Sequence, residues 1–240
     1  MKKLIILLNL SCFMPVLANA EMVPPLSLQH RASIEISKGV GTGNIDQQNH
    51  RLSGKLVSGY GRYTNELKGN ISNLENSNGN SEVGYKIGER LKYEVTEGGN
   101  VFGEVERVGN KTSGVKSRTS ELLGYEQLLI EKDGFDMSGE AGAGFRQSDY
   151  QPGLEDANSL LGKVGTDINW EFYKNVKLNN NSYMAYAEDN TQTVSDTSIK
   201  TFLYRGAYIK GAVEVENNSK VPVGYKKTDT VTSIGMGYDF

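Results

Sequence analysis

Apolar and polar residues alternate along most of the chain with a period of two. In residues 159–173, apolar side chains occupy one face of an extended strand and charged or amide side chains occupy the other, because successive residues point to opposite sides. The pattern recurs at 134–148 and 207–217, and sustained helical periodicity is hard to find. The alternation therefore predicts an all-β chain.

Reading the mature chain in this way predicts about twelve strands, with ten as the alternative. Segments of about ten residues that are separated by turn residues are what a transmembrane barrel requires. The predicted fold is a single antiparallel up-and-down transmembrane β-barrel over residues 21–240. The expected strands span 28–40, 48–62, 66–74, 82–95, 100–109, 117–131, 134–148, 159–173, 176–189, 196–205, 207–217 and 227–240.

From the second strand onward, the predicted connections alternate between short and long. Outer-membrane barrels have short periplasmic turns and longer external loops, so an even number of strands places both termini in the periplasm. The first connection, at 41–44, is the exception, because it is short where a long loop is expected.

The N-terminus has the features of a cleaved signal peptide over residues 1–20. Two lysines precede an apolar stretch that ends at Leu17, and the small residues at 18–20 predict cleavage between Ala20 and Glu21. An uncleaved anchor is the alternative, but the apolar stretch is too short and too interrupted for it. The leader contains the single cysteine, Cys12, so disulfides, thiol nucleophiles and thiolate metal sites are excluded from the mature chain.

The C-terminal residues contain a second targeting pattern. Residues 232–240 alternate up to Phe240, so that Ile234, Met236, Tyr238 and Phe240 share one face. This pattern resembles the barrel-insertion signal of outer-membrane proteins. The expected location is the bacterial outer membrane, and the expected partners are its lipid, the barrel-assembly machinery and periplasmic chaperones. The formal net charge of −3, which becomes more negative without the leader, argues against nucleic acid as a partner.

A soluble barrel would alternate as well, with its charged face outward. The leader, the terminal phenylalanine and aromatic residues near strand ends favour a membrane barrel, whose charged face lines the lumen and can pair across strands. The candidate lumen charges are Glu104, Glu106, Glu140, Arg146, Lys163, Asp167, Lys210 and Glu214, with Glu35, Lys55, Lys86 and Arg90 on the same side.

Two segments resemble a known family. Residues 221–230, Val-Pro-Val-Gly-Tyr-Lys-Lys-Thr-Asp-Thr, resemble the tail of the DUF481 family. Residues 39–46 resemble its first hairpin, although Ile45 stands where a threonine is usual. The resemblance implies an outer-membrane barrel of the YdiY-like type, described as salt-induced, and it supplies no catalytic residues.

Catalytic chemistry has little support in the sequence. His30 and His50 have no neighbouring metal ligands, and Ser53 falls on the opposite strand face from His50. Glu104 and Glu106 could form an acid pair, but lumen cations favour a structural role for them. We therefore predict no catalytic, cofactor or metal site and no enzyme. The sequence favours a structural or envelope-stress barrel with a narrow charged pore. An ion or small-solute channel is the alternative, a barrel-embedded hydrolase a distant one, and the oligomeric state stays open.

Overall fold

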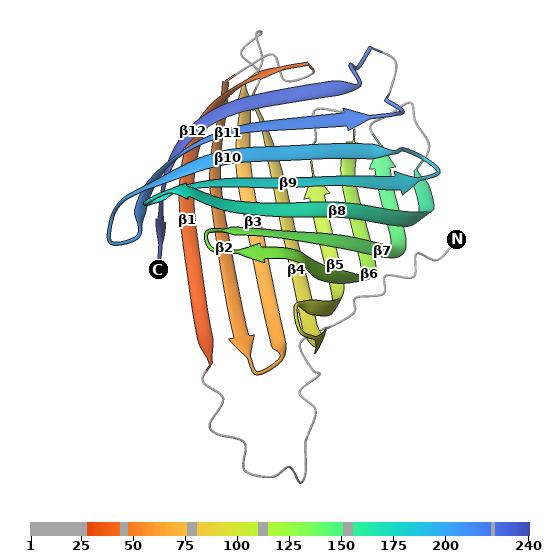
Figure 1. Ribbon diagram of the computed structural model, residues 1–240. Coiled ribbons are helices and arrows are strands. Elements are labelled where there is room, and N and C mark those ends of the chain that lie inside the picture. The colour runs from red at the N-terminus through yellow and green to blue at the C-terminus, as the bar shows by residue number, and fades with distance from the viewer. Residues whose placement is uncertain (1–27, 44–47, 76–80, 110–114, 151–155, 222–223) are drawn as a thin grey trace.

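The computed structural model describes residues 28–43, 48–75, 81–109, 115–150, 156–221 and 224–240, and within them the strands form one closed antiparallel barrel (Figure 1). Every strand pairs with its neighbours in sequence, and β1 pairs with β12. The strands are β1 (Gln29–Thr42), β2 (Gln48–Tyr60), β3 (Tyr63–Glu75), β4 (Ser81–Thr96), β5 (Gly99–Gly109), β6 (Val115–Lys132), β7 (Phe135–Tyr150), β8 (Ala157–Tyr173), β9 (Val176–Ala187), β10 (Gln192–Tyr204), β11 (Ala207–Asn218) and β12 (Thr228–Asp239). The predicted all-β fold with about twelve strands is confirmed.

The predicted short first connection at 41–44 is wrong. β1 continues to Thr42, because Gly41 pairs with Val231 and Thr42 pairs with Thr230 of β12. The glycines of this segment indicated a turn from sequence, but their backbone belongs to the seam that closes the barrel. With β2 beginning at Gln48, the connection spans 43–47 and is as long as those at 76–80 and 110–114, so it does not depart from the alternation.

Short turns join the strands at one end of the barrel, where β1 begins and β12 ends. They lie at 61–62, 97–98, 133–134, 174–175 and 205–206. Two-residue hairpins that match the twist of their strands need a positive φ, and the turns supply it. The residues with positive φ are Gly61, Gly98, Gly134, Asn175, Arg205 and Gly206. The longer connections lie at the other end, as the sequence predicted.

Apolar side chains cover the outside of the barrel. Leu123, Leu160 and Met236 are 75%, 72% and 70% exposed, which is the reverse of a soluble barrel. Near the short turns, the rings of Tyr63 and Tyr93 lie 4.8 Å apart, and further aromatic pairs contact one another on β8 and at the end of β12. Within the described residues, no helix is long and apolar enough to cross a membrane.

The interior holds a small apolar cluster on the side of β6, β8 and β9. Leu122, Leu161, Ala185 and Ala187 are buried there, and Tyr183 packs against them. In Figure 1, β8–β11 cross the direction of β1–β4 at a steep angle, so the two walls face each other across the interior. Most of the remaining inward-facing positions are polar or charged.

Candidate functional site

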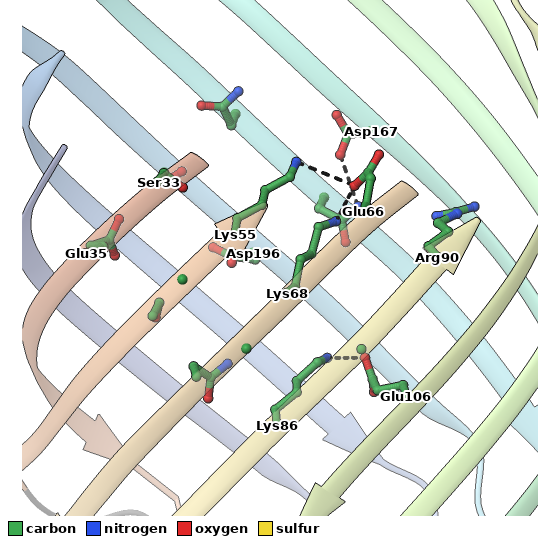
Figure 2. Close-up of a pocket in the computed structure, with 18 of the residues that line it drawn as sticks. Ser33, Glu35, Lys55, Glu66, Lys68, Lys86, Arg90, Glu106, Asp167 and Asp196 are labelled. Atoms are coloured by element: carbon green, nitrogen blue, oxygen red, sulfur yellow. Dashed lines mark hydrogen bonds and ion pairs between the residues drawn. The ribbon is translucent and has the colours of Figure 1, made fainter. Parts of the chain in front are cut away.

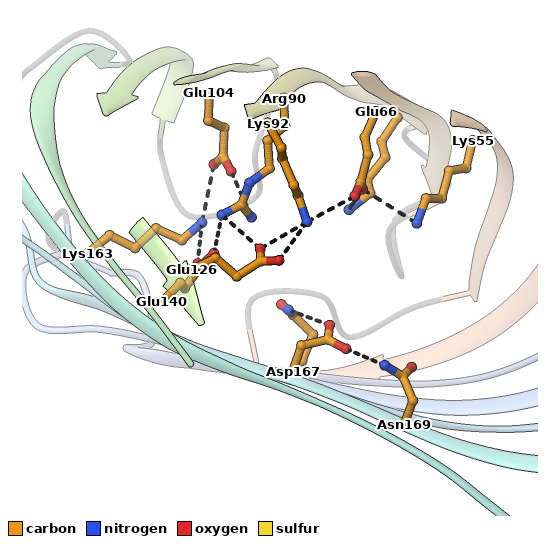
Figure 3. A network of polar contacts seen from close by, with 12 residues as sticks. Lys55, Glu66, Arg90, Lys92, Glu104, Glu126, Glu140, Lys163, Asp167 and Asn169 are labelled. Carbon is orange, nitrogen blue, oxygen red and sulfur yellow. Dashed lines mark hydrogen bonds and ion pairs between the residues drawn. The ribbon is translucent and has the colours of Figure 1, made fainter. Parts of the chain in front are cut away.

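Interlocked ion pairs cross the interior between β3 and β8 (Figure 3). The Arg90 guanidinium lies 3.5 Å from Glu104 and 3.4 Å from Glu126, and it also contacts Glu140. We call this group the ion-pair belt. Its members, whose side chains are only 12–17% exposed, are Glu66, Arg90, Lys92, Glu104, Glu126, Glu140 and Lys163.

The strand register explains why the belt needs its cations. Glu126 of β6 stands directly opposite Glu140 of β7, and like charges at such positions repel. Arg90 contacts both carboxylates from β4, while Lys163 Nζ lies 3.1 Å from Glu140. Arg90 also lies over the ring of Phe102, 3.7 Å from its centroid, which adds a cation–π contact.

Lys92 extends the belt toward β3. Its Nζ lies 2.9 Å from Glu126 and 3.2 Å from Glu66. Each cation of the belt therefore contacts at least two carboxylates. Such a network fixes the distance between the strands that carry it, because no member can move without losing several contacts.

A second group of cations on β2–β4 is far more exposed (Figure 2). Lys55 stands opposite Lys68 in the register, and both share the carboxylate of Glu66, at 3.5 and 3.1 Å. Lys86 lies 2.7 Å from Glu106. The side chains of Lys55, Lys68 and Lys86 are 45%, 57% and 41% exposed. We call these three residues the lysine row.

The lysine row faces a cavity of about 470 Å³ inside the barrel. On the facing wall, the cavity is lined by Asp167 of β8 and Asp196 of β10. Asp167 accepts hydrogen bonds from Asn169 and Asn181, at 2.9 and 3.1 Å. Both walls carry both signs, because Glu66 and Glu106 lie among the lysines of the row while Lys163 and Lys200 lie on the facing wall, so the cavity has a mixed and densely charged lining.

The strands next to the seam carry separate ion pairs. Lys210 Nζ lies 2.8 Å from Glu35, which also accepts a 3.2 Å hydrogen bond from Tyr208. Arg51 pairs with Glu214 at 3.0 Å. These pairs bridge β1, β2 and β11, which are neighbours or near neighbours around the seam.

At the end with long connections, two buried arginines reach the segment that joins β9 to β10. Arg146 Nη1 donates to the backbone oxygen of Asn190 at 3.1 Å, and Arg118 Nη1 donates to Gln192 at 3.2 Å. Asp189 accepts hydrogen bonds from Ser148 and Tyr150, both at 3.0 Å.

Burial alone would raise the pKa of Asp189, but these hydrogen bonds outweigh it and lower the pKa. The connection 188–191 is therefore anchored toward the interior, and it narrows this mouth of the barrel.

The predicted lumen charges occupy three of these environments. Glu214 belongs to the pairs near the seam, and Arg146 lies at the narrowed mouth. The others line the cavity, namely Glu104, Glu106, Glu140, Lys163, Asp167 and Lys210. The sequence analysis missed Glu66, Lys68, Lys92 and Glu126, although the spacing of Glu66 and Lys68 by two places them on one strand face.

The two acids considered for catalysis contact cations, and one of the two histidines contacts a serine. Glu104 and Glu106 each contact a lysine or arginine. His30 Nδ1 lies 2.9 Å from Ser58 Oγ on the exposed face, a contact the sequence analysis did not predict. In the described part of the chain, no group of three or more His, Cys, Asp or Glu residues could hold a metal ion.

The terminal residues lie where the insertion signal was expected. Ile234, Met236, Tyr238 and Phe240 are 66%, 70%, 39% and 73% exposed on the outer face. Whether they act as the signal stays a prediction. The expected cleavage site at Ala20 and Glu21 lies outside the described residues.

Comparisons with known proteins agree with the fold and with the sequence resemblance. The family model described as "Protein of unknown function, DUF481" matches residues 34–240. The uncharacterized protein YdiY of Escherichia coli (strain K12) is 25% identical over 206 residues, which are 83% of this chain and 81% of YdiY. The NanC porin superposes with a TM-score of 0.60 at 8% identity, covering 85% of this chain and 98% of NanC. For the KdgM porin, the TM-score is 0.51 at 12% identity, with 87% and 99% covered. The chain belongs to the DUF481 family and is an outer-membrane β-barrel of the YdiY type.

Proposed function

We propose that this barrel is a narrow outer-membrane channel for ions and small hydrophilic solutes. The observation that carries the proposal is the cavity of about 470 Å³ between the lysine row and the facing wall of Asp167 and Asp196. A polar cavity of this kind holds water, and charged side chains that line it set the preference among ions. The lysines of the row are exposed enough to contact a passing solute, whereas the belt residues that line the same cavity are largely buried in ion pairs.

The proposed orientation places both termini in the periplasm. The short turns and the ends of β1 and β12 lie on the same side of the barrel, and short turns are periplasmic in barrels of this class. The narrowed mouth, where Arg146 anchors the connection 188–191 and Arg118 holds the first residue of β10, is then the external one. A solute entering the cell would pass this constriction before it reached the lysine row.

The charge pattern favours small anions or solutes with separated charges. Anions can contact the exposed lysines of the row, and cations can contact Asp167 and Asp196. One structure of the KdgM porin is a complex with disordered oligogalacturonate, which is a reason to include acidic saccharides among the solutes that are tested.

A structural barrel without transport is the second candidate. It is supported by the ion-pair belt and by the apolar cluster around Leu122 and Leu161, which fill part of the interior. A salt-induced or envelope-stress role fits either candidate, and impaired growth of a deletion strain at high salt would support that role.

Conductance of the refolded protein in planar bilayers tests the channel directly. We expect steady single-channel steps, and Ser198→Trp should reduce them to half or less because Ser198 lines the cavity. Thr232→Trp is the matched control, since Thr232 is exposed on the outer face of β12, and its conductance should equal that of the wild type. Silence from protein that shows the heat-dependent gel shift of a folded barrel would overturn the channel and favour the structural role.

A further inference from the structure

The outer face of β9 and β10 is interrupted by four polar side chains that bind one another. Asn180 Nδ2 donates to Thr197 Oγ1 at 2.8 Å and to Ser195 Oγ at 3.3 Å. Ser182 Oγ lies 3.0 Å from Asn180 Oδ1 and 2.9 Å from Ser195 Oγ. We call Asn180, Ser182, Ser195 and Thr197 the polar island.

The alternation of each strand places the island outside the barrel. Asn179, Asn181 and Tyr183 of β9 line the interior cavity, so the residues between them point outward. On β10, Asp196 and Ser198 line the same cavity. The intervening Ser195 and Thr197 therefore face outward as well.

Apolar side chains border much of the island. Ile168 of β8 stands opposite Asn180, and Val213 of β11 stands opposite Thr197. Met184 on β9 and Ile199 on β10 are 48% and 46% exposed. The island therefore lies within the apolar band that contacts lipid, away from the aromatic residues near the short turns.

Hydrocarbon offers no hydrogen-bond partner, so polar groups in this band gain from contact with other polar groups. The bonds within the island use the oxygens of Ser195 and Thr197 as acceptors for Asn180. Because Thr197 Oγ1 accepts from Asn180, the Thr197 hydroxyl hydrogen can be donated to an acceptor on another molecule. Thr166 of β8, which stands opposite Ser182, adds a further hydroxyl to the same surface.

We propose that the polar island is the contact surface for a second copy of this chain within the membrane. The island is neutral and carries both donors and acceptors, so it is complementary to itself across a two-fold axis along the membrane normal. A charged partner would find no opposite charge on the island. Its small hydroxyl side chains, with Gly139 opposite Thr166, allow two barrel walls to approach closely, as small residues do between transmembrane helices.

Single-cysteine variants locate the contact. The chain's one cysteine is Cys12, within the predicted leader, so Ser195→Cys introduces a unique thiol into the mature protein. Mild oxidation in vesicles should convert Ser195→Cys into a disulfide-linked dimer and leave Ile71→Cys monomeric, because Ile71 is exposed on β3, on the opposite side of the barrel. Equal cross-linking of both variants, or of neither, would overturn the proposed contact.

Removing the hydrogen-bonding groups provides an independent test. The double variant Asn180→Leu/Thr197→Val should raise the dimer dissociation constant, measured by analytical ultracentrifugation in detergent, by roughly tenfold or more. Asn65→Leu, which removes a polar group from the exposed side of β3 across the barrel, is the control and should dimerise as the wild type does. A heat-dependent gel shift verifies that each variant is folded. A wild-type protein that is monomeric at every concentration, or a double variant that associates normally, contradicts the proposal.

Discussion

The ion-pair belt and the lysine row use the same chemical groups in opposite ways. In the belt, Arg90, Lys92 and Lys163 each contact two or more carboxylates, and their side chains are 14%, 16% and 12% exposed. In the row, Lys55 and Lys68 share one carboxylate and are about half exposed. The cations of the two groups have the same charge and lie on adjoining walls. What distinguishes them is their burial and the number of carboxylates that each contacts.

From this difference we expect the ion-pair belt to stabilise the barrel and the lysine row to contact solutes. Losing one partner of a buried ion pair leaves an uncompensated charge in a poorly solvated place, whereas an exposed pair contributes little to the free energy of folding. A lysine that stays hydrated can exchange its partner for a passing anion. Variants that are matched in chemistry and differ in region should therefore have different consequences.

The largest effect is expected from Arg90→Met. This variant leaves Glu104, Glu126 and Glu140 without their shared guanidinium, so we expect the free energy of unfolding to fall by about 3–5 kcal/mol. Urea unfolding in lipid vesicles measures it. Arg90→Lys should recover part of the loss, since it keeps the charge without the forked geometry. A midpoint unchanged by Arg90→Met would show that the belt does not stabilise the barrel.

A smaller difference in stability is expected between variants of Lys92 and Lys68, which both contact Glu66. Lys92→Gln removes contacts to Glu66 and Glu126 from a residue that is 16% exposed, and we expect a loss of about 1–3 kcal/mol. Lys68→Gln removes a contact from a residue that is 57% exposed, and we expect less than about 1 kcal/mol. The same urea titration compares them, and equal losses would remove the distinction between belt and row.

The largest effect on selectivity is expected from the row. Lys55→Gln/Lys68→Gln/Lys86→Gln should leave the barrel folded and shift the reversal potential in a salt gradient toward cation preference, because carboxylates then outnumber cations in the cavity lining. Replacing Lys38, which is exposed on the outer side of β1, by glutamine is the control and should change neither property. A reversal potential unaffected by the triple variant would show that the row does not contact the permeating ion.

The sequence was sufficient for the strands because alternation with a period of two is a local property. It predicted which side of β8 faces outward and which charges face the lumen from neighbouring residues alone. The contacts of the belt were not predictable in this way. Lys163 meets Glu104 from β8 to β5, and that contact depends on how the two walls face each other across the interior.

The polar island was missed for a different reason. Asn179, Asn180 and Asn181 are identical in type, so alternation gives no sign of which of them faces outward. Only the pairing of β9 with β8 and β10 settles the face. The extent of β1 at Gly41 was predicted wrongly for a related reason. Gly41 pairs with β12, which lies at the other end of the chain.

The seam between β1 and β12 has a consequence for the order of assembly. It joins Ser33 to Asp239, and the Phe240 N–H donates to the Ala32 oxygen at 2.8 Å. These contacts join residues near the two ends of the described chain. Closing so long a loop costs conformational entropy, so they form only after the intervening hairpins are arranged. A chain that lacks β12 would present two open strand edges, which are prone to aggregate. Only a chain that includes β12 can therefore close the barrel, and truncated chains keep exposed strand edges that proteases can attack.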